Sequence, residues 1–456
     1  MPSALKATIT PPITRRRFLQ TVSTAIVSPL ILPGSVFGKG ARPAPSSRVT
    51  LGVIGLGAMG TGNLRSFLGL PDAQVVAVCD VDKQHYRDQD WGKGMAFGRA
   101  PAKKGVEDYY AKEQPGGTFK GCQTYSDFRE LCARKDIDAV VVATPDHWHA
   151  LCTLEALRQG KDVYCEKPVT HLFKEGQVVY REVAKRKAVF QTGSQQRSTA
   201  NFRKAVELVL NGCIGKVKEV EVGLPAGYKE PQGDTTVQTP PDHLDYDFWC
   251  GPSPVLPYMR ARHHRLWRGH LAYGGGNIMD WIGHHNDIAH WGLGLDHGGP
   301  EEVEAVGWTY PQTDIYNTPV DFEIRCRYPG GIRLAIASRF KLGTKWIGEN
   351  GWVHVDRHKL QASDPAWVKS DFQPGPVKAY DSPDHHQNFI DCVKSRKECV
   401  APAETAHRSV TPGHLAYIAH AVGRKLRWDA KREKIIGDAA ADKLLKVEYR
   451  KPWKLS

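Results

Sequence analysis

The stretch Leu51–Gly60, LGVIGLGAMG, decides the fold. Apolar residues before Gly55 predict a short buried strand, and apolar residues at helical spacing follow Gly60. In the pattern Gly55-x-Gly57-x-x-Gly60 the first glycine permits a tight turn, the second lets the backbone approach a pyrophosphate, and the third lets the helix pack on the strand. The free N–H groups at the start of that helix attract phosphate. The stretch therefore predicts a dinucleotide-binding turn, with a turn that binds no ligand as the alternative.

A second apolar strand, 75–79, ends at Asp80, about 20 residues past the glycines. A carboxylate at this distance is expected to hold the ribose of a dinucleotide. Its charge would repel a 2′-phosphate, which favours NAD over NADP. Strand and helix then alternate up to residue 170, as in a parallel sheet.

The composition is that of an ordinary soluble protein, with 41% hydrophobic and 24% charged residues among 456. The net charge of +13 suits an anionic cofactor, and no basic run is long enough to predict nucleic-acid binding. The ten cysteines form no C-x-x-C pair, so neither a zinc site nor a disulfide framework is expected.

Residues 1–40 resemble an export signal. Residues 14–20, TRRRFLQ, match the twin-arginine pattern, and the apolar region 21–32 is too short and too interrupted by proline to span a membrane. We therefore expect export in folded form, to the periplasm or to a membrane anchor facing it. An unstructured basic N-terminus is the alternative.

The rest of the chain divides into a linker, two domains and a tail. The predicted fold class is α/β: a linker at 41–47, an N-terminal Rossmann dinucleotide-binding domain at 48–170, a C-terminal α+β domain with a largely antiparallel open sheet at 171–430, and a tail at 431–456. Within the second domain, the irregular segment 225–272 is rich in Pro, Trp and His. A long loop of this kind is more often functional than decorative.

Three motifs in order carry a family resemblance: the glycine turn, Glu166-Lys167-Pro168, and residues 274–284, GGGNIMDWIGH. Together they resemble the Gfo/Idh/MocA oxidoreductases, over essentially everything after residue 47. The resemblance implies that Asp280 and His284 bind substrate hydroxyls and assist proton transfer. We also expect a homo-oligomer.

The same residues support this chemistry without the family. Oxidation of a secondary alcohol needs a base for the hydroxyl proton while hydride leaves the carbon. Lys167 follows a predicted strand, 162–165, at the edge where ligands of such sheets bind. We expect Glu166 to orient the Lys167 side chain. Pro168 restricts the backbone of Lys167, and a cis bond between these two residues is one form that the turn can take. Asp280 and His284 share a face if their segment is helical. A surface lysine in an ordinary turn is the alternative for Lys167.

The predicted site residues fall into three groups. The catalytic residues are Lys167, Asp280 and His284. The cofactor-binding residues are Gly55, Leu56, Gly57, Ala58, Met59, Gly60, Asp80, Thr144, Pro145, His147, His149, Glu166 and Lys167. The substrate-contacting candidates are Gln195, Arg197, Tyr273 and His285. No metal is expected: the histidines at 284, 285 and 290 with Asp287 raise that alternative, but no HExxH pattern accompanies them.

These observations predict an exported NAD-dependent dehydrogenase for a sugar, polyol or glycoside hydroxyl. Twin-arginine export carries folded proteins, so the NAD should be bound before export and bound tightly. Two rivals remain open. One is a glycosidase that uses its NAD as a recycled catalyst, through oxidation, elimination and reduction. The other is a non-catalytic sugar- or nucleotide-binding protein.

Overall fold

The computed structural model describes residues 42–87, 93–114, 116–446 and 448–455. The predicted export signal at 1–40 lies outside these residues. The chain divides into two units, Met1–Arg48 and Val49–Ser456. In the first unit, a short 3-10 helix, η2 (Pro45–Ser47), occupies part of the predicted linker.

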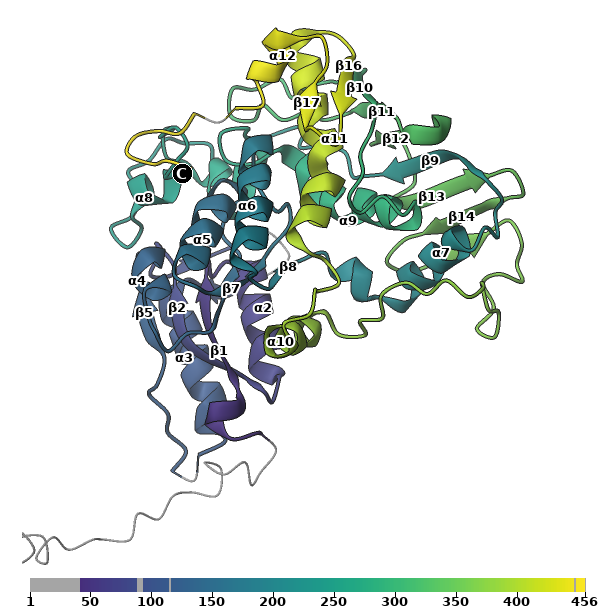
Figure 1. Ribbon diagram of the computed structural model, residues 1–456. Helices are drawn as coiled ribbons and strands as arrows, with labels where there is room; N and C mark the ends of the chain where they lie inside the picture. Colours follow the sequence, from purple (N-terminus) through teal and green to yellow (C-terminus); the bar gives the residue numbers. More distant parts are fainter. Residues whose placement is uncertain (1–41, 88–92, 115, 447, 456) are drawn as a thin grey trace, which may run out of the picture. The chain divides into compact units, whose positions relative to one another are not determined.

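The first half of the second unit is a parallel six-stranded sheet in the order β5-β2-β1-β6-β7-β8 (Figure 1). Its strands are β1 (Val49–Ile54), β2 (Ala73–Cys79), β5 (Gln123–Tyr125), β6 (Ala139–Val142), β7 (Asp162–Cys165) and β8 (Phe190–Thr192). The connecting helices are α2 (Ala58–Gly69), α3 (Arg99–Ala111), α4 (Phe128–Cys132), α5 (Asp146–Arg158) and α6 (Phe173–Arg186). The strand order reverses at β1, between β2 and β6, so a crevice is expected beyond the carboxyl ends of these strands.

Two details differ from the expected Rossmann domain. Strand β8 pairs with β7, so the parallel sheet continues to Thr192, past the predicted boundary at 170. The polar segment after Asp80 contains a small hairpin, β3 (His85–Tyr86) and β4 (Ala96–Phe97), before α3. Neither pairing is visible in the sequence, because both depend on neighbours that are distant in the chain or on very short strands.

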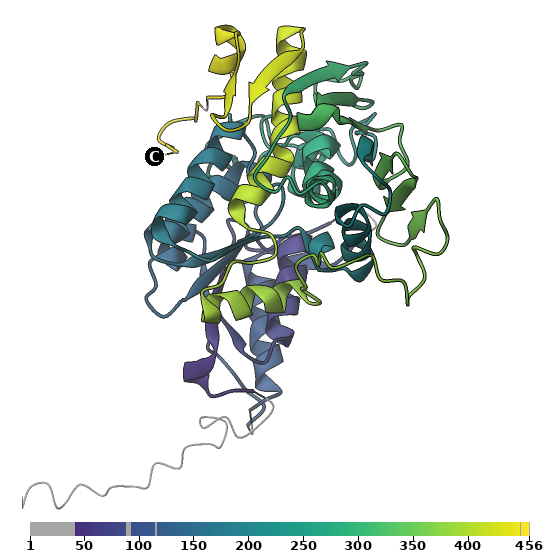
Figure 2. The same cartoon turned by 45° about the vertical axis from the view of Figure 1, so that its right-hand side comes forward.

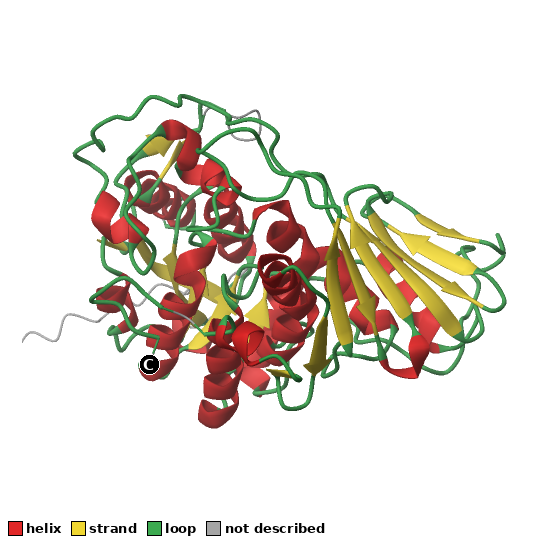
Figure 3. Cartoon of the chain, turned by 90° about the horizontal axis from the view of Figure 1, so that it is seen from above, coloured by secondary structure: helices red, strands yellow, loops and turns green. Residues whose placement is uncertain are grey.

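The second sheet has nine strands in the order β15-β14-β13-β9-β12-β11-β10-β16-β17. The pairs are antiparallel except β9 with β12, which is parallel. The strands are β9 (Val217–Gly223), β10 (Glu302–Val306), β11 (Glu323–Arg327), β12 (Arg333–Ala337), β13 (Gly343–Gly348), β14 (Trp352–Val355), β15 (Leu360–Ala362), β16 (Leu426–Asp429) and β17 (Lys434–Ile435). Figure 3 shows them side by side, beside the helices that link this sheet to the parallel one. The predicted fold class is confirmed.

Helices from the second half complete both layers. They are α7 (Ala200–Leu210), α8 (Tyr246–Cys250), α9 (Gly276–Gly292), α10 (His385–Ser395), α11 (Ala403–Val422) and α12 (Ala439–Lys443), with 3-10 turns η3 (Gln195–Ser198), η4 (Arg260–Arg262), η5 (His264–Gly269) and η6 (Pro329–Gly331). α9 packs on β13, β9 and α11. α10 lies against α2 of the first half, as Figures 1 and 2 both show, and its Phe389 joins the same apolar core as Phe67.

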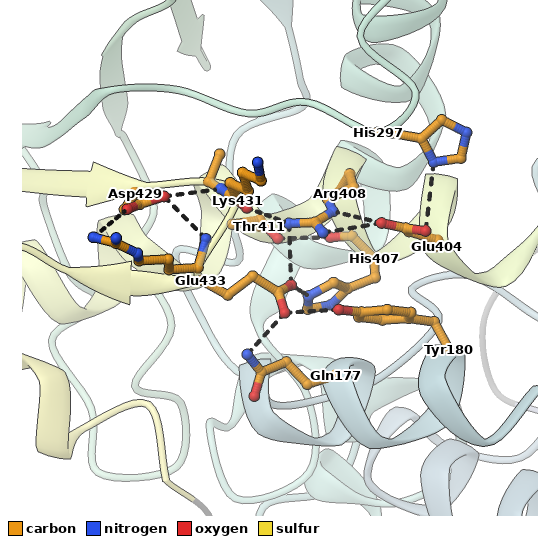
Figure 4. A network of polar contacts seen from close by, with 12 residues as sticks. Gln177, Tyr180, His297, Glu404, His407, Arg408, Thr411, Asp429, Lys431 and Glu433 are labelled. Carbon is orange, nitrogen blue, oxygen red and sulfur yellow. Dashed lines mark hydrogen bonds and ion pairs between the residues drawn. The ribbon is translucent and has the colours of Figure 1, made fainter. Parts of the chain in front are cut away.

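The C-terminal residues are part of the fold rather than a tail. β16 pairs with β10, and β17 pairs with β16. Between these strands Glu433, at φ 53°, turns its carboxylate into the molecule, where it accepts hydrogen bonds from Gln177 and Tyr180 of α6 and contacts His407 and Arg408 of α11 (Figure 4). This polar network ties the last hairpin to two helices.

Candidate active site

A cavity of about 430 Å³ lies at the carboxyl ends of β1, β2, β6 and β7 and is closed by α9 and the 225–272 segment. Most of the predicted cofactor-binding and catalytic residues line it: Gly55, Leu56, Gly57, Ala58, Met59, Asp80, Thr144, Pro145, His149, Glu166, Lys167, Asp280 and His284. Residues more than 200 positions apart in the sequence therefore meet in one volume.

The glycine turn has the shape that a pyrophosphate requires. Gly55 has φ 85°, and a Cβ there would lie 2.6 Å from the Ala143 backbone. A Cβ on Gly60 would lie 1.8 Å from the Gly55 carbonyl oxygen, so this glycine lets α2 pack on β1 without lining the cavity. A Cβ on Gly57 would meet nothing within 4 Å, and no side chain caps the start of α2. The turn thus leaves backbone N–H groups open to an anion.

Asp80 is held at the mouth of this turn. One carboxylate oxygen accepts the Leu56 N–H at 2.6 Å, and the other accepts the Asp82 N–H at 2.9 Å. Burial raises the pKa of Asp80. Its position at the end of β2, beside the glycine turn, fits the ribose of a dinucleotide.

Lys167 and Asp280 form a close pair in the cavity wall. The Lys167 Nζ donates to Asp280 Oδ1 at 2.6 Å and to the Asp280 backbone oxygen at 2.9 Å. The Lys167 side chain is 8% exposed. Lys167 follows β7, its bond to Pro168 is cis, and Asp280 lies in the second turn of α9. Gly283 allows this approach, because a Cβ there would lie only 3.3 Å from the Lys167 Cβ.

A second cation, Arg268, reaches the same carboxylate. Its Nε lies 3.1 Å from Asp280 Oδ1, and its guanidinium lies over the Trp267 ring. Burial alone would raise the pKa of Asp280, but the charges of Arg268 and Lys167 outweigh it and hold that pKa well below its usual range. Asp280 is therefore an anion at neutral pH.

The pKa of the neighbouring Asp146, the first residue of α5, is shifted in the opposite direction. Burial raises its pKa to about 7, with Asp280 adding to the effect and Arg268 opposing it. Asp146 does not line the cavity, but it and Asp280 are two neighbouring carboxyl groups whose environments drive their pKa values apart. That pattern is common where one group carries charge and the other carries a proton.

His284 lies one helical turn beyond Asp280, as the predicted helix requires. Burial and the charges of Lys167 and Arg357 lower its pKa well below the usual value, so its imidazole is neutral. The Trp281 ring packs against it, and Arg357 lies over the outer face of that ring. His284, Trp281 and Arg357 all line the cavity.

No hydrogen bond joins the Glu166 carboxylate to the Lys167 ammonium among the described residues. Its Oε1 instead accepts from Asn63 at 2.9 Å and from Gln195 at 3.1 Å. The contacts that fix the Lys167 ammonium come from Asp280. Burial raises the pKa of Glu166.

Four other predicted residues support the site from outside the cavity. His147 bonds to the backbone oxygens of Trp249 and Tyr273. The Tyr273 hydroxyl bonds to Pro254. Gln195 holds Glu166, and His285 is fully buried behind Trp281. The structure does not bring these side chains to the cavity.

Arg197 differs most from its predicted place. Its guanidinium is 2% exposed and pairs with Asp287 at 2.7 Å and Asp296 at 2.7 Å. With Asp287 occupied in this way and His290 bonded to Tyr328, the metal alternative at 284–290 loses two of its ligands to other partners.

Three residues of the site were not among the sequence predictions: Arg268, Arg357 and Asp146. Arg268 comes from the irregular 225–272 segment, and Arg357 comes from the turn between β14 and β15. Asp146 is adjacent to the predicted residue His147. The other two lie in no motif, so only the fold reveals them.

Comparison with known proteins places these observations in a family. The model for "Oxidoreductase family, NAD-binding Rossmann fold" matches residues 49–194. The model for "Oxidoreductase family, C-terminal alpha/beta domain", of the Gfo/Idh/MocA oxidoreductases, matches residues 198–455. Only residues 195–197, just after β8, separate the two matches.

Individual relatives are more distant. The chain is 29% identical over 166 residues to myo-inositol 2-dehydrogenase of Thermotoga maritima, covering 36% of this chain and 42% of that protein. It is 32% identical over 127 residues to a glycosyl hydrolase family 109 protein of Shewanella sp. (strain ANA-3), covering 28% and 24%. The chain thus spans less than half the length of these relatives.

The fold likeness covers more of the chain. A solved structure of scyllo-inositol dehydrogenase from Lactobacillus casei, with bound NAD(H) and scyllo-inositol, matches with a TM-score of 0.55 at 18% identity, over 83% of this chain and 99% of that one. At this identity the match shows a shared fold. Across the described residues, we find no helix with both the length and the apolar character of a membrane span.

Proposed function

Because the chain belongs to the Gfo/Idh/MocA oxidoreductase family, we propose that it moves a hydride between NAD and a secondary hydroxyl of a sugar, polyol or glycoside. The observation that carries this proposal is the Lys167–Asp280–Arg268 cluster in the same cavity as the glycine turn. A base and a dinucleotide turn in one volume are what this oxidation needs.

The cofactor has a fitting cradle. The backbone of the Gly55–Gly60 turn would hold the pyrophosphate, and Asp80 would hold the ribose. The N–H groups that no side chain caps at the start of α2 support this fit. When bound, the nicotinamide supplies the hydride acceptor.

Lys167 is proposed to manage the hydroxyl proton. In the direction of oxidation, the Lys167 ammonium first releases a proton to solvent, and the resulting amine takes the proton of the substrate hydroxyl while the carbinol hydrogen leaves as hydride, so that the alcohol becomes a carbonyl. Asp280 fixes the position of Nζ through its 2.6 Å contact and stabilises the ammonium that forms. Arg268 keeps Asp280 ionised during this cycle.

His284 and the aromatic rings are proposed to hold the substrate. A neutral imidazole can donate to or accept from a sugar hydroxyl. Trp267 and Trp281 line the same cavity and offer apolar faces to a sugar ring. The inositol substrates named for two relatives are of this polyhydroxy class.

The direct test begins with purified, undialysed protein. We expect mass spectrometry to find NAD(H), and we expect myo-inositol, scyllo-inositol or a free aldose to reduce the bound NAD. Lys167→Ala should lose this turnover, whereas exposed Lys218→Ala should retain it. NADP(H) in place of NAD(H), or full turnover in Lys167→Ala, would overturn the proposal.

A second function has a specific observation in its favour, the glycosyl hydrolase family 109 relative. In that reading the bound NAD is recycled, so oxidation at one carbon promotes loss of a glycosidic group and reduction restores the cofactor. Release of nitrophenol from nitrophenyl glycosides without net NADH would support this function. A protein that holds NAD but changes no substrate would support the non-catalytic alternative.

We also propose export in folded form with the cofactor already tightly bound, and a homo-oligomer. Residues 14–20 motivate the export. The full chain with its twin-arginine pair replaced by Lys-Lys should stay in the cytoplasm, while the natural chain should reach the periplasmic fraction carrying NAD. Equal distribution of the two chains would contradict this proposal, and light scattering tests the oligomer.

A further inference from the structure

The cavity lining carries more positive than negative charge around Asp280. Among the described residues, five cationic side chains line the cavity: Arg87, Lys167, Arg265, Arg268 and Arg357. Lys167 and Arg268 contact the Asp280 carboxylate at 2.6 Å and 3.1 Å, so two cations already share one negative charge. Because burial raises the pKa of the nearby Asp146 to about 7, that carboxyl group adds less than a full negative charge at neutral pH. A neutral substrate would leave this positive excess in place, whereas an anionic substrate would offset it.

The remaining carboxylates of the lining serve other partners. Asp80 accepts backbone N–H groups, Asp82 contacts imidazole rings, and Glu166 accepts from two side-chain amides. Across the part of the chain that the structure describes, no carboxylate lies within ion-pair distance of Arg265 or Arg357. These two guanidinium groups therefore line the cavity with no described carboxylate as a partner.

Arg357 is the one of these two that lies beside the proposed catalytic residues. Its guanidinium carbon is 4.8 Å from the centre of the Trp281 ring, and that ring packs against the His284 imidazole. Burial lowers the pKa of Arg357, and the charge of Asp280 opposes this effect. The Arg357 side chain still reaches solvent, so an incoming ligand can meet it. Arg357 thus lies within electrostatic reach of Asp280 and His284.

The neighbours of Arg357 orient its side chain without neutralising its charge. The guanidinium lies over Trp281, which favours one orientation of its plane. With the Gln196 amide turned so that both of its ends have partners, its oxygen accepts from Arg357 Nε at 3.1 Å and its nitrogen donates to the His284 backbone oxygen at 3.0 Å. An arginine has five N–H groups, so the N–H groups on the two Nη atoms remain for a ligand.

A carboxylate is the group that this pair of Nη atoms fits best. Its two oxygens accept two parallel N–H bonds from a guanidinium, and its single negative charge matches the single positive charge of Arg357. A phosphate monoester carries a charge of about −1.5 to −2 at neutral pH, so one guanidinium would leave part of that charge unbalanced. The charge and the geometry of Arg357 therefore both favour a carboxylate.

We propose that the substrate is a sugar acid, a polyhydroxy compound with a carboxylate, and that Arg357 binds this carboxylate. The inference rests on the proposed function and narrows its substrate class. The carboxylate only fixes the position of the substrate, and the hydroxyl near Lys167 remains the group that is oxidised. With its carboxylate on Arg357 and its hydroxyl groups near Asp280 and His284, the substrate is held at two places in the cavity.

The test is titration calorimetry of the full chain saturated with NADH, which cannot accept a hydride. The probes are D-glucuronate with D-glucose, and D-galacturonate with D-galactose, because each pair differs only in whether C6 is a carboxylate or an alcohol. We expect at least one acid to bind at least about 10-fold more tightly than its parent sugar, as charge-assisted hydrogen bonds predict.

Variants assign the preference for the acid to one side chain. Arg357→Gln should reduce the affinity ratio of acid to parent sugar to about one, and Arg357→Lys, which keeps the charge but not the paired N–H groups, should keep part of it. Lys359→Gln is the matched control, because it removes a positive charge from an exposed position two residues along the chain. It should keep the wild-type ratio.

Turnover separates this inference from the proposed function. If the protein oxidises the acid, Arg357→Gln should raise its KM by about 10-fold or more and leave kcat near the wild-type value, since the carboxylate is bound equally before and during the reaction. A preference for the acid in binding, without oxidation of any probe, would contradict the proposed function and still support a carboxylate site at Arg357.

Three results would overturn the inference. One is a wild-type chain that binds neither acid more tightly than its parent sugar, a result that needs no variant. Another is a preference for the acid that survives in Arg357→Gln, or that is lost in Arg265→Gln instead. The third is tighter binding of glucose 6-phosphate than of both acids, which would assign the site to phosphate. Circular dichroism of each variant shows whether it is folded.

Discussion

Two buried carboxylates, Asp280 and Glu433, each lie among cationic side chains and histidine, but only Asp280 lines the cavity. Asp280 contacts Lys167 and Arg268 in a cavity wall. Glu433 contacts His407, Arg408 and the α6 side chains in the network of Figure 4, and no residue of that network is among the described residues that line the cavity.

The electrostatics of the two sites are alike. Burial would raise the pKa of both carboxyl groups, and in both the neighbours reverse the effect. For Glu433 the hydrogen bond and charge of His407 hold the pKa at about 2. A shifted pKa therefore does not identify the active site here. Access to the cavity does identify the active site, because, of these two carboxylates, only Asp280 lines the cavity and contacts Lys167 there.

The largest effect is expected from Lys167→Ala. Loss of the proposed base should lower turnover by about 10³-fold, within the usual range for general acid–base catalysis. The exposed Lys218→Ala serves as the control. Steady-state rates per mole of folded protein measure the effect, and a loss below tenfold would remove Lys167 from the proposed chemistry.

Glu433→Ala should act on stability instead. Removing this carboxylate leaves Arg408 and His407 without their buried partner, which costs about 3–5 kcal/mol. Denaturant titration measures the cost, and turnover per folded molecule should match the wild type. Stability within about 1 kcal/mol of the wild type would show that the network is not an anchor.

Asp146 offers a test through pH. Burial raises its pKa to about 7, whereas an unfolded chain has an aspartate pKa of about 3.9. Between those values the native state keeps a proton that the unfolded state has lost, so the free energy of unfolding falls as pH rises. The contribution is about 1.4 kcal/mol per pH unit. Asp146→Asn should show a shallower fall between about pH 4 and 7, and an equally steep fall would contradict the assignment.

The smallest effect is a shift in a pH profile. Arg268→Gln removes one of the two cations that keep the pKa of Asp280 low, so that pKa should rise. The acid limb of the turnover profile should move up by about one pH unit. The exposed Arg325→Gln should leave the profile unchanged. A profile that does not move in Arg268→Gln would mean that Arg268 does not control Asp280.

Much of this site could be predicted from short motifs. The glycine turn, Asp80, Lys167 and the Asp280–His284 spacing each follow from local chemistry, and the structure gathers all of them around one cavity. The fold class followed from the change between strand–helix alternation and strand-rich sequence.

The remainder depended on pairing over long distances. Arg268 and His264 lie in a segment without periodicity, so nothing in the sequence places them beside Asp280 and Asp82. Arg197 looked like a cleft residue from its motif, but it pairs with Asp287 and Asp296 at the back of α9. Residues 431–456 looked like a tail because β17 is only two residues long.

The most direct measurement compares Asp280→Asn with Glu433→Gln in one experiment, recording turnover per folded molecule and melting temperature for both. The account predicts that Asp280→Asn loses at least about 100-fold in turnover and keeps a melting temperature near that of the wild type. It predicts that Glu433→Gln keeps its turnover and melts at a lower temperature. Undiminished turnover in Asp280→Asn, or loss of turnover in folded Glu433→Gln, would contradict the central claim that the cavity carboxylate serves chemistry and the enclosed one serves stability.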